Sequence, residues 1–76
     1  MRLKIDRDND ALYMRLSDER IVESAELSTG VVADYDEHGN LVGLEMLDVA
    51  KHAGLKKGLG PLVVEQVPPE PAESLP

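Results

Sequence analysis

The chain has 76 residues, of which 42% are hydrophobic and 3% aromatic, and it carries a formal net charge of −7. This length supports one hydrophobic core, which excludes two separately folded domains. The excess of acidic residues opposes binding to nucleic acid or to anionic lipid, because both are polyanions. The lack of cysteine excludes a disulfide framework and a thiol nucleophile.

Apolar residues occur only in short runs along the chain. No apolar run reaches the length of a membrane span or of a signal peptide, so we expect a cytoplasmic protein without membrane contact. Because Phe and Trp are absent, the core must be aliphatic, with Tyr13 and Tyr35 as the only aromatic residues. Domains of this size draw only about 3–5 kcal/mol from one core. We therefore expect stabilisation by self-association.

The first predicted element is a hairpin formed by residues 2–6 and 11–16. The intervening Arg7-Asp8-Asn9-Asp10 suits a turn, because Asn and Asp tolerate turn dihedral angles and bond to their own backbone. Pairing Asp6 with Ala11 gives one entirely apolar face, with Ile5 against Leu12, Leu3 against Met14 and Met1 against Leu16. The opposite face then carries Arg2, Lys4, Tyr13 and Arg15.

Three further strands are predicted over residues 20–27, 31–36 and 41–48. The first of them has an irregular apolar pattern, which indicates a β-bulge. The other two flank Glu37-His38-Gly39-Asn40, where Gly39 can supply a positive φ. A four-residue loop pairs Asp36 with Leu41, and this register places Tyr35 against Val42, Ala33 against Leu44 and Val31 against Met46.

The remaining sequence predicts a short helix and an extended tail. Asp48 is the expected N-cap of a helix over Val49–Ala53, which ends at Gly54. Residues 55–61 form a loop, and Leu62–Val67 is apolar enough for a sixth, edge-type strand. The Pro/Glu-rich residues 68–76 form a tail that lacks backbone donors. The expected fold is mostly β (α+β): one domain over residues 1–67 with an antiparallel β-meander of four or five strands.

Four stretches of this sequence resemble a known family. They are Asp10–Ser17 (DALYMRLS), Glu23–Leu27 (ESAEL), Gly30–Asp36 (GVVADYD) and Gly39–Asp48 (GNLVGLEMLD). In order and spacing they resemble the prokaryotic family named domain of unknown function 2283, over residues 1–51. The resemblance implies a compact β-rich domain and carries no activity, ligand or catalytic residue. Some members look as if they are encoded beside small toxin-like proteins, which suggests an antitoxin role.

Acidic residues near the second predicted turn provide the candidate metal ligands Asp34, Asp36 and Glu45. Their spacing is close to that of a calcium loop, but the flanks are strand-like rather than helical and His38 is a poor oxygen-donor substitute. Neither His38 nor His52 has a predicted metal partner. The chain has no nucleophile elbow and no phosphate-binding loop, so we expect no enzymatic activity and no cofactor.

The leading interpretation is a non-enzymatic, homodimeric protein-interaction module. Its candidate interface residues are Leu3, Tyr13, Met14 and Leu44, with Tyr13 on the face opposite to the apolar one. The acidic surface also favours a basic protein partner, such as a small toxin-like protein. Two alternatives are a metal-binding domain that uses the acidic hairpin turn and an enzyme whose site forms across a dimer interface.

Overall fold

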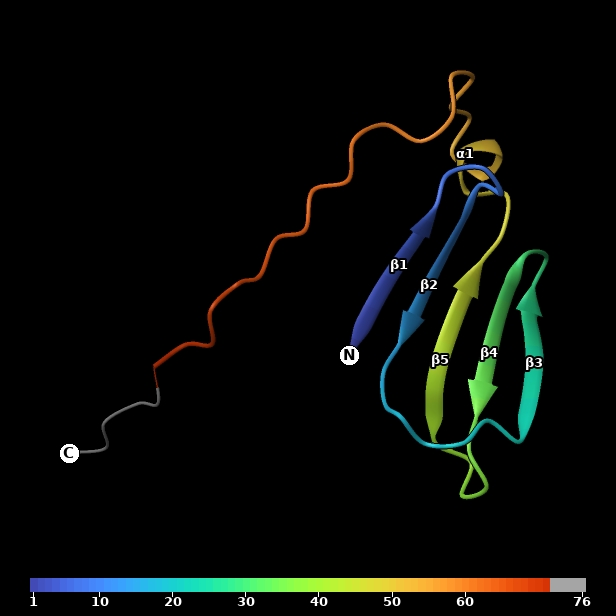
Figure 1. Ribbon diagram of the computed structural model, residues 1–76, viewed down its shortest axis with the longest axis vertical. Coiled ribbons are helices and arrows are strands. Elements are labelled where there is room, and N and C mark those ends of the chain that lie inside the picture. The colour runs from blue at the N-terminus through green and yellow to red at the C-terminus, as the bar shows by residue number, and fades with distance from the viewer. Residues whose placement is uncertain (72–76) are drawn as a thin grey trace.

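The computed structural model describes residues 1–71 and consists of one antiparallel sheet with a short helix at one end (Figure 1). The elements are β1 (Arg2–Asp6), β2 (Ala11–Arg15), β3 (Glu23–Ser28), β4 (Val31–Tyr35), β5 (Leu41–Met46) and α1 (Val49–His52). The expected fold class, a mostly β antiparallel sheet with one short helix, is confirmed.

The β1–β2 hairpin has the register that the sequence predicts. Asp6 lies opposite Ala11, Ile5 opposite Leu12 and Leu3 opposite Met14. Asp6 closes the turn, because its carboxylate accepts the Asn9 backbone N–H at 3.1 Å and the Asn9 side-chain amide at 2.8 Å. The ladder begins at Arg2, so Met1 does not pair with Leu16, and the Leu16 N–H instead donates to the Val42 carbonyl at 2.9 Å.

The β4–β5 hairpin confirms part of its expected register and corrects the rest. Val31 pairs with Met46 and Ala33 with Leu44, as expected. Tyr35, however, pairs with Leu41 rather than with Val42, because the register shifts after Asp34. The Asp36–Asn40 turn causes this shift. The Asp36 N–H donates to the Asn40 carbonyl, and the Asp36 carbonyl accepts the Gly39 N–H. The extra residue beside the turn is accommodated in β5.

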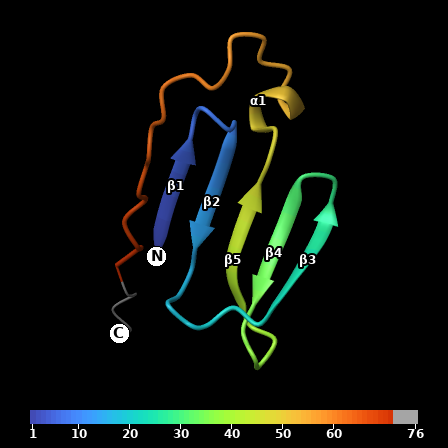
Figure 2. The same cartoon turned by 45° about the vertical axis from the view of Figure 1, so that its right-hand side comes forward.

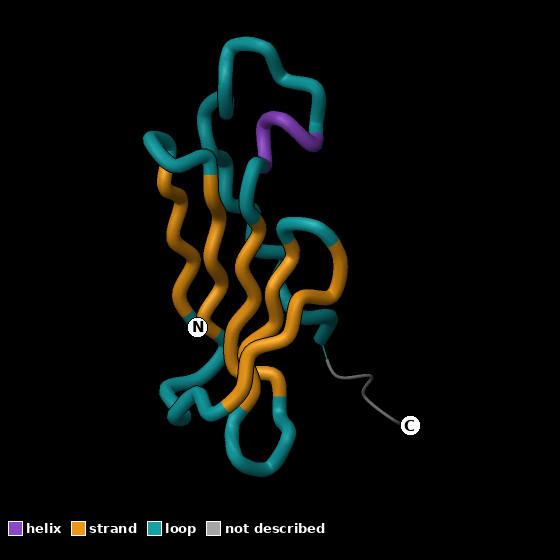
Figure 3. The backbone as a smooth tube through the Cα atoms, turned by 90° about the vertical axis from the view of Figure 1, so that its right-hand side faces the viewer, coloured by secondary structure: helices purple, strands orange, loops and turns teal. Residues whose placement is uncertain are grey.

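The strands are arranged in the order β1-β2-β5-β4-β3. The chain leaves β2, crosses the end of the sheet through residues 16–22 and enters β3 at the far edge (Figure 3). Strands β2 to β5 thus form a Greek key rather than a simple up-and-down meander. Arg15 holds the start of this crossing, since its guanidinium donates to the Ser17 and Glu19 carbonyls at 2.7 and 2.5 Å. The bulge expected in the third strand lies in β3, between Glu26 and Ser28.

The short helix α1 corrects one prediction about its N-terminus. Asp48 stands at the N-cap position but has a left-handed backbone with φ 53°, and its side chain makes no capping bond. The cap comes from Asp10 of the β1–β2 turn, whose carboxylate accepts the Ala50 N–H at 2.9 Å. The C-terminus is as expected, because Gly54 has φ 69° and the Gly54 and Leu55 N–H groups bond to the Lys51 and Ala50 carbonyls.

Residues 60–71 run as an extended segment outside the sheet (Figure 2), and it diverges from β1 in the view of Figure 1. The expected sixth strand over residues 62–67 is not formed, and these residues are exposed to solvent. Of the tail expected over residues 68–76, the last five residues lie outside the described part of the chain.

Fully buried apolar side chains are few. Within residues 1–71 they are Ala33, Val42 and Ala50, with 0%, 1% and 5% of their surface exposed. A five-stranded sheet has two faces, and here α1 covers its end rather than either face (Figure 1). The hydrophobic interior of the single chain is therefore thin.

Candidate functional site

The two faces of the sheet differ sharply in chemistry, and cross-strand pairing shows which residues share each face. On the polar face, one row across the sheet contains Lys4, Tyr13, Glu45, Val32 and Glu26. The next row contains Arg2, Arg15, Gly43, Asp34 and Ser24. Basic side chains therefore lie on β1 and β2, and acidic side chains lie on β5, β4 and β3.

The apolar face is formed by the alternate residues of the same strands. Its first row contains Leu3, Met14, Leu44, Ala33 and Ala25, and its second contains Ile5, Leu12, Met46, Val31 and Ser28. Leu3 is 46% exposed, and most of the other large side chains of this face are half-buried. The bulky residues lie on β1, β2, β5 and β4, whereas β3 contributes Ala25 and Ser28. This face is continuous, apolar and incompletely covered by its own chain.

Tyr13 lies on the polar face and joins three strands through a hydrogen-bonded cluster. Its hydroxyl donates to Asp34 at 2.9 Å, and the Ser24 hydroxyl donates to the other carboxylate oxygen of Asp34 at 2.5 Å. To reach Asp34 on β4, the Tyr13 ring extends over β5 at Gly43. A Cβ at Gly43 would collide with the Tyr13 hydroxyl and would stand 3.0 Å from the Asp34 carboxylate. The glycine is therefore what allows Tyr13 to contact Asp34.

The candidate metal ligands have other bonding partners. Asp34 is bonded to Tyr13 and Ser24, and Asp36 is bonded within its own turn. Glu45 lies in the row next to that of Asp34 on the polar face. Across residues 1–71, no three His, Cys, Asp or Glu side chains come together as a metal-binding group. The structure thus places Asp34, Asp36 and Glu45 on neighbouring elements without bringing them to one point.

Asp36 organises the β4–β5 turn. One of its carboxylate oxygens accepts the N–H groups of His38 and Asn40, both at 2.9 Å, and the other accepts the Asn40 amide at 3.2 Å. The bonds from Asn40 lower the pKa of the Asp36 carboxyl, although its burial acts in the opposite direction. The bonds from Asn9 likewise lower the pKa of Asp6 in the first turn. Both carboxylates are structural.

The two histidines lie at opposite ends of the sheet. His38 is exposed at the β4–β5 turn, 3.4 Å from the Glu37 carboxylate. His52 belongs to α1, and its ring lies beside Gly30 of the β3–β4 turn. Because of this separation, the two histidines do not form a shared metal site.

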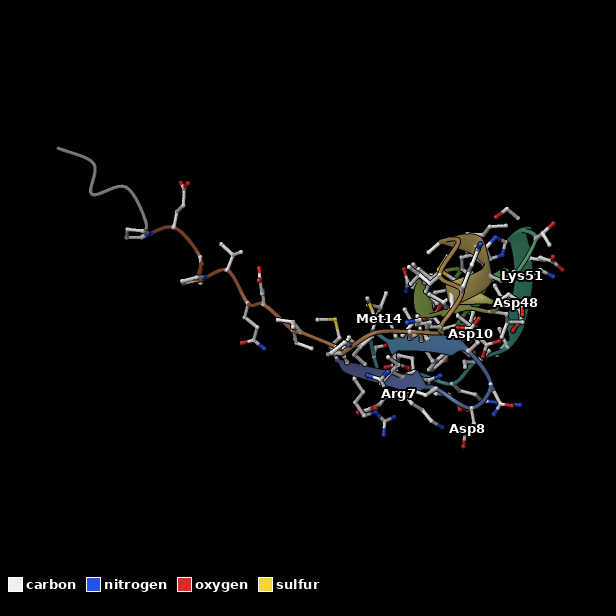
Figure 4. The ribbon with its side chains drawn as sticks, turned by 90° about the horizontal axis from the view of Figure 1, so that it is seen from above. Arg7, Asp8, Asp10, Met14, Asp48 and Lys51 are labelled. Atoms are coloured by element: carbon white, nitrogen blue, oxygen red, sulfur yellow. The ribbon has the colours of Figure 1, made fainter. Side chains whose placement is uncertain are left out.

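The end of the sheet at α1 contains the largest hollow described, of about 520 Å³. Asp10 lies on the side of the β1–β2 turn that faces α1, whereas Arg7 and Asp8 lie further out (Figure 4). Arg7 contributes to the wall and donates to the Leu59 carbonyl at 2.8 Å. The other lining side chains include Lys51, Leu55 and Lys56. This hollow is an open depression, partly lined by the residues that follow α1.

Comparison with known proteins finds a family match over the residues that form the sheet. The family model described as "Protein of unknown function (DUF2283)" matches residues 2–49, which extend from the first residue of β1 to the first residue of α1. The chain belongs to this family. No curated protein and no solved structure matches the chain. In the described part of the chain, no helix is both long enough and apolar enough to cross a bilayer.

Two structural residues were missed by reasoning from the sequence. Gly43 has a detectable signal, since a glycine inside a strand marks close approach by another group. Asp10 has none, because its partner Ala50 is 40 residues away along the chain.

Proposed function

We propose that this protein is a non-enzymatic interaction module whose apolar sheet face pairs with the same face of a second copy. The observation that supports the proposal is the apolar surface formed by two rows that cross the sheet. One row begins at Leu3 on β1 and reaches Ala33 on β4, and the other begins at Ile5 on β1 and reaches Val31 on β4. Large apolar side chains on it stay partly exposed in the single chain. Contiguous exposed apolar surface is typical of protein–protein contact sites.

The distribution of charge allows a second copy to occupy this face. Each chain carries −7, so two copies repel each other least when they meet through a face that has no charged side chain. The two apolar rows contain no charged side chain, whereas the polar face carries charges on every strand. A two-fold axis would place each apolar row against an equivalent row, as a symmetric dimer requires.

The test is the mass of the native particle in solution, measured by light scattering. The wild type should have twice the monomer mass. Leu44→Lys, in the middle of the apolar face, should give a monomer, because it buries an unpaired charge between the copies. Val32→Lys adds the same charge to the polar face and should remain dimeric. Circular dichroism confirms that each variant is folded, and the milder Leu3→Lys, at a 46% exposed position, serves if Leu44→Lys unfolds.

Dimeric Leu3→Lys and Leu44→Lys proteins would contradict the proposal, as would a monomeric wild type at micromolar concentration.

We also propose that the acidic part of the polar face receives a basic protein, in an antitoxin-like role. Glu26, Asp34 and Glu45 lie on three adjacent strands of this face, and they stay accessible when the apolar face is covered. Complementary charge raises the rate of encounter with such a partner. Glu26→Lys combined with Glu45→Lys should abolish its capture from the native cell, whereas Glu70→Lys in the tail should not.

A further inference from the structure

Residues 62–67 (LVVEQV) have the sequence of a strand but pair with no strand within residues 1–71 of their own chain. Pro61 precedes this segment and Pro68 follows it, so it contains six residues that can each donate a backbone N–H. Strands of this sheet have five or six residues. The segment is extended, and Leu62, Val63, Val64 and Val67 are 45–88% exposed. Such a segment is suited to addition at a sheet edge.

The sheet offers two edges, and they differ in how well they could receive a strand. Within residues 1–71, β1 pairs on one side with β2, and the other side is open. The β1 ladder is regular throughout Arg2–Asp6. At the opposite edge, β3 contains the bulge between Glu26 and Ser28, and bulges hinder edge-to-edge pairing. The regular backbone therefore favours β1.

Charge favours the same edge. Alternation along a strand places Leu62 and Val64 on one face and Glu65 on the other. When the segment is added beside β1 so that Leu62 and Val64 continue the apolar rows of Leu3 and Ile5, Glu65 lies on the same face as Arg2 and Lys4. At the β3 edge, the same orientation would bring Glu65 to the face of Glu26. Arg2 is free to change partners, because its ion pair with Asp18 is 3.5 Å long and exposed.

We propose that residues 62–67 of one copy add to the open β1 edge of a second copy as its sixth strand. In its own chain, Arg7 holds Leu59 at the end of β1, and the following residues lead away from the sheet (Figures 1 and 4). Reciprocal exchange would occupy both β1 edges of a dimer and close the assembly. The inference rests on the proposed function, which supplies the second copy.

The experiment uses the full chain and paramagnetic relaxation in nuclear magnetic resonance. Because the chain has no cysteine, Glu70→Cys accepts a nitroxide at one site just beyond the segment. The nitroxide-carrying chain, which contains no nitrogen-15, is mixed with a nitrogen-15-labelled wild-type chain. Loss of signal then reports only contacts between copies. We expect loss of amide intensity at Arg2–Asp6 of the labelled chain and retention at Glu23–Ser28. Val63→Pro combined with Val64→Pro in the spin-carrying chain should restore the β1 intensity, because neighbouring N–H groups of a strand point to opposite sides, so one of these two prolines removes a donor that faces β1.

Each other outcome overturns a defined statement. Equal loss at both edges, or loss that survives the combined Val63→Pro and Val64→Pro substitutions, overturns the exchange. So does loss seen only when the nitroxide and the nitrogen-15 are on the same chain, since this is docking within one molecule. A particle of dimer mass with unaffected β1 signals overturns the exchange and leaves the proposed function standing. A particle of monomer mass overturns the proposed function itself.

Discussion

Gly43 and Tyr13 lie in close contact on the polar face. The Tyr13 ring occupies the space that any side chain at position 43 would need, and its hydroxyl bonds to Asp34. This arrangement connects β2 to β4 across β5 with one part-buried hydrogen bond, which contributes about 1 kcal/mol. Tyr13, which the sequence predicts as an interface residue, is thus hydrogen-bonded within its own chain.

Gly43→Ala should lower the free energy of unfolding by about 2–4 kcal/mol, from overpacking and from loss of the Tyr13–Asp34 bond. Urea denaturation followed by circular dichroism measures this loss. In a Tyr13→Phe background the hydroxyl is gone, so the same substitution should cost less. Equal costs in the two backgrounds would contradict the coupling between these residues.

The structural roles of Asp10 and Asp48 differ from those that the sequence predicts, which are a turn residue for Asp10 and the helix N-cap for Asp48. Both have positive φ, at 51° and 53°, but only the side chain of Asp10 accepts a hydrogen bond from the helix N-terminus, whereas Asp48 bonds to the helix through its backbone carbonyl alone. Asp10→Ala should lower the free energy of unfolding by about 1–2 kcal/mol, because the Ala50 N–H loses its acceptor. Asp48→Gly should leave it unchanged or raise it by up to about 1 kcal/mol, since glycine adopts this conformation without strain. The opposite order of the two effects in thermal denaturation would restore Asp48 as the cap.

At the scale of elements, the two hairpin turns each depend on a carboxylate. Asp6 and Asp36 accept hydrogen bonds from their own turns, and these bonds lower the pKa of both groups. A carboxyl whose pKa falls on folding stabilises the fold above its unfolded pKa of about 3.9. That stabilisation is lost as the pH falls through the lower pKa of the folded state.

The unfolding midpoint should therefore fall as the pH is lowered below about 4, with both turns contributing. Asp36→Asn should be less stable than the wild type at neutral pH and should lose less stability on acidification. Asp8→Asn, at an exposed position of the first turn, is the matched control and should follow the wild-type profile. Parallel profiles for Asp36→Asn and wild type, by thermal melts from pH 7 to 2, would refute this role for Asp36.

At the scale of the whole molecule, the dominant feature is the uneven covering of the sheet. The buried apolar residues of the described chain are small, and the large ones of the apolar face stay partly exposed. Pairing two such faces would build a two-layer core of the kind that sheet-on-sheet packing provides. Stability would then belong to the assembly and would depend on protein concentration.

The unfolding temperature of the wild type should fall by about 2–4 °C for each tenfold dilution, because dissociation accompanies unfolding of the paired chains. Differential scanning fluorimetry over a hundredfold range of concentration measures this shift. The Leu44→Lys variant should melt at a temperature that does not depend on concentration. A constant melting temperature for the wild type would contradict a stabilising dimer.

The sequence by itself determined the five strands apart from their exact ends, the register of the first hairpin from Leu3 to Asp6, the bulge in β3, the glycine end of α1 and the chemistry of the two faces, but it also predicted a strand over residues 62–67 that is not formed. These features depend on neighbours a few residues apart, where alternation and turn residues act directly. Only the tertiary structure decided the place of β3 at the far edge, the shift at Tyr35, the Asp10 cap and the Tyr13–Asp34 bond. Each of these joins residues distant along the chain, and local patterns do not record which distant groups will meet.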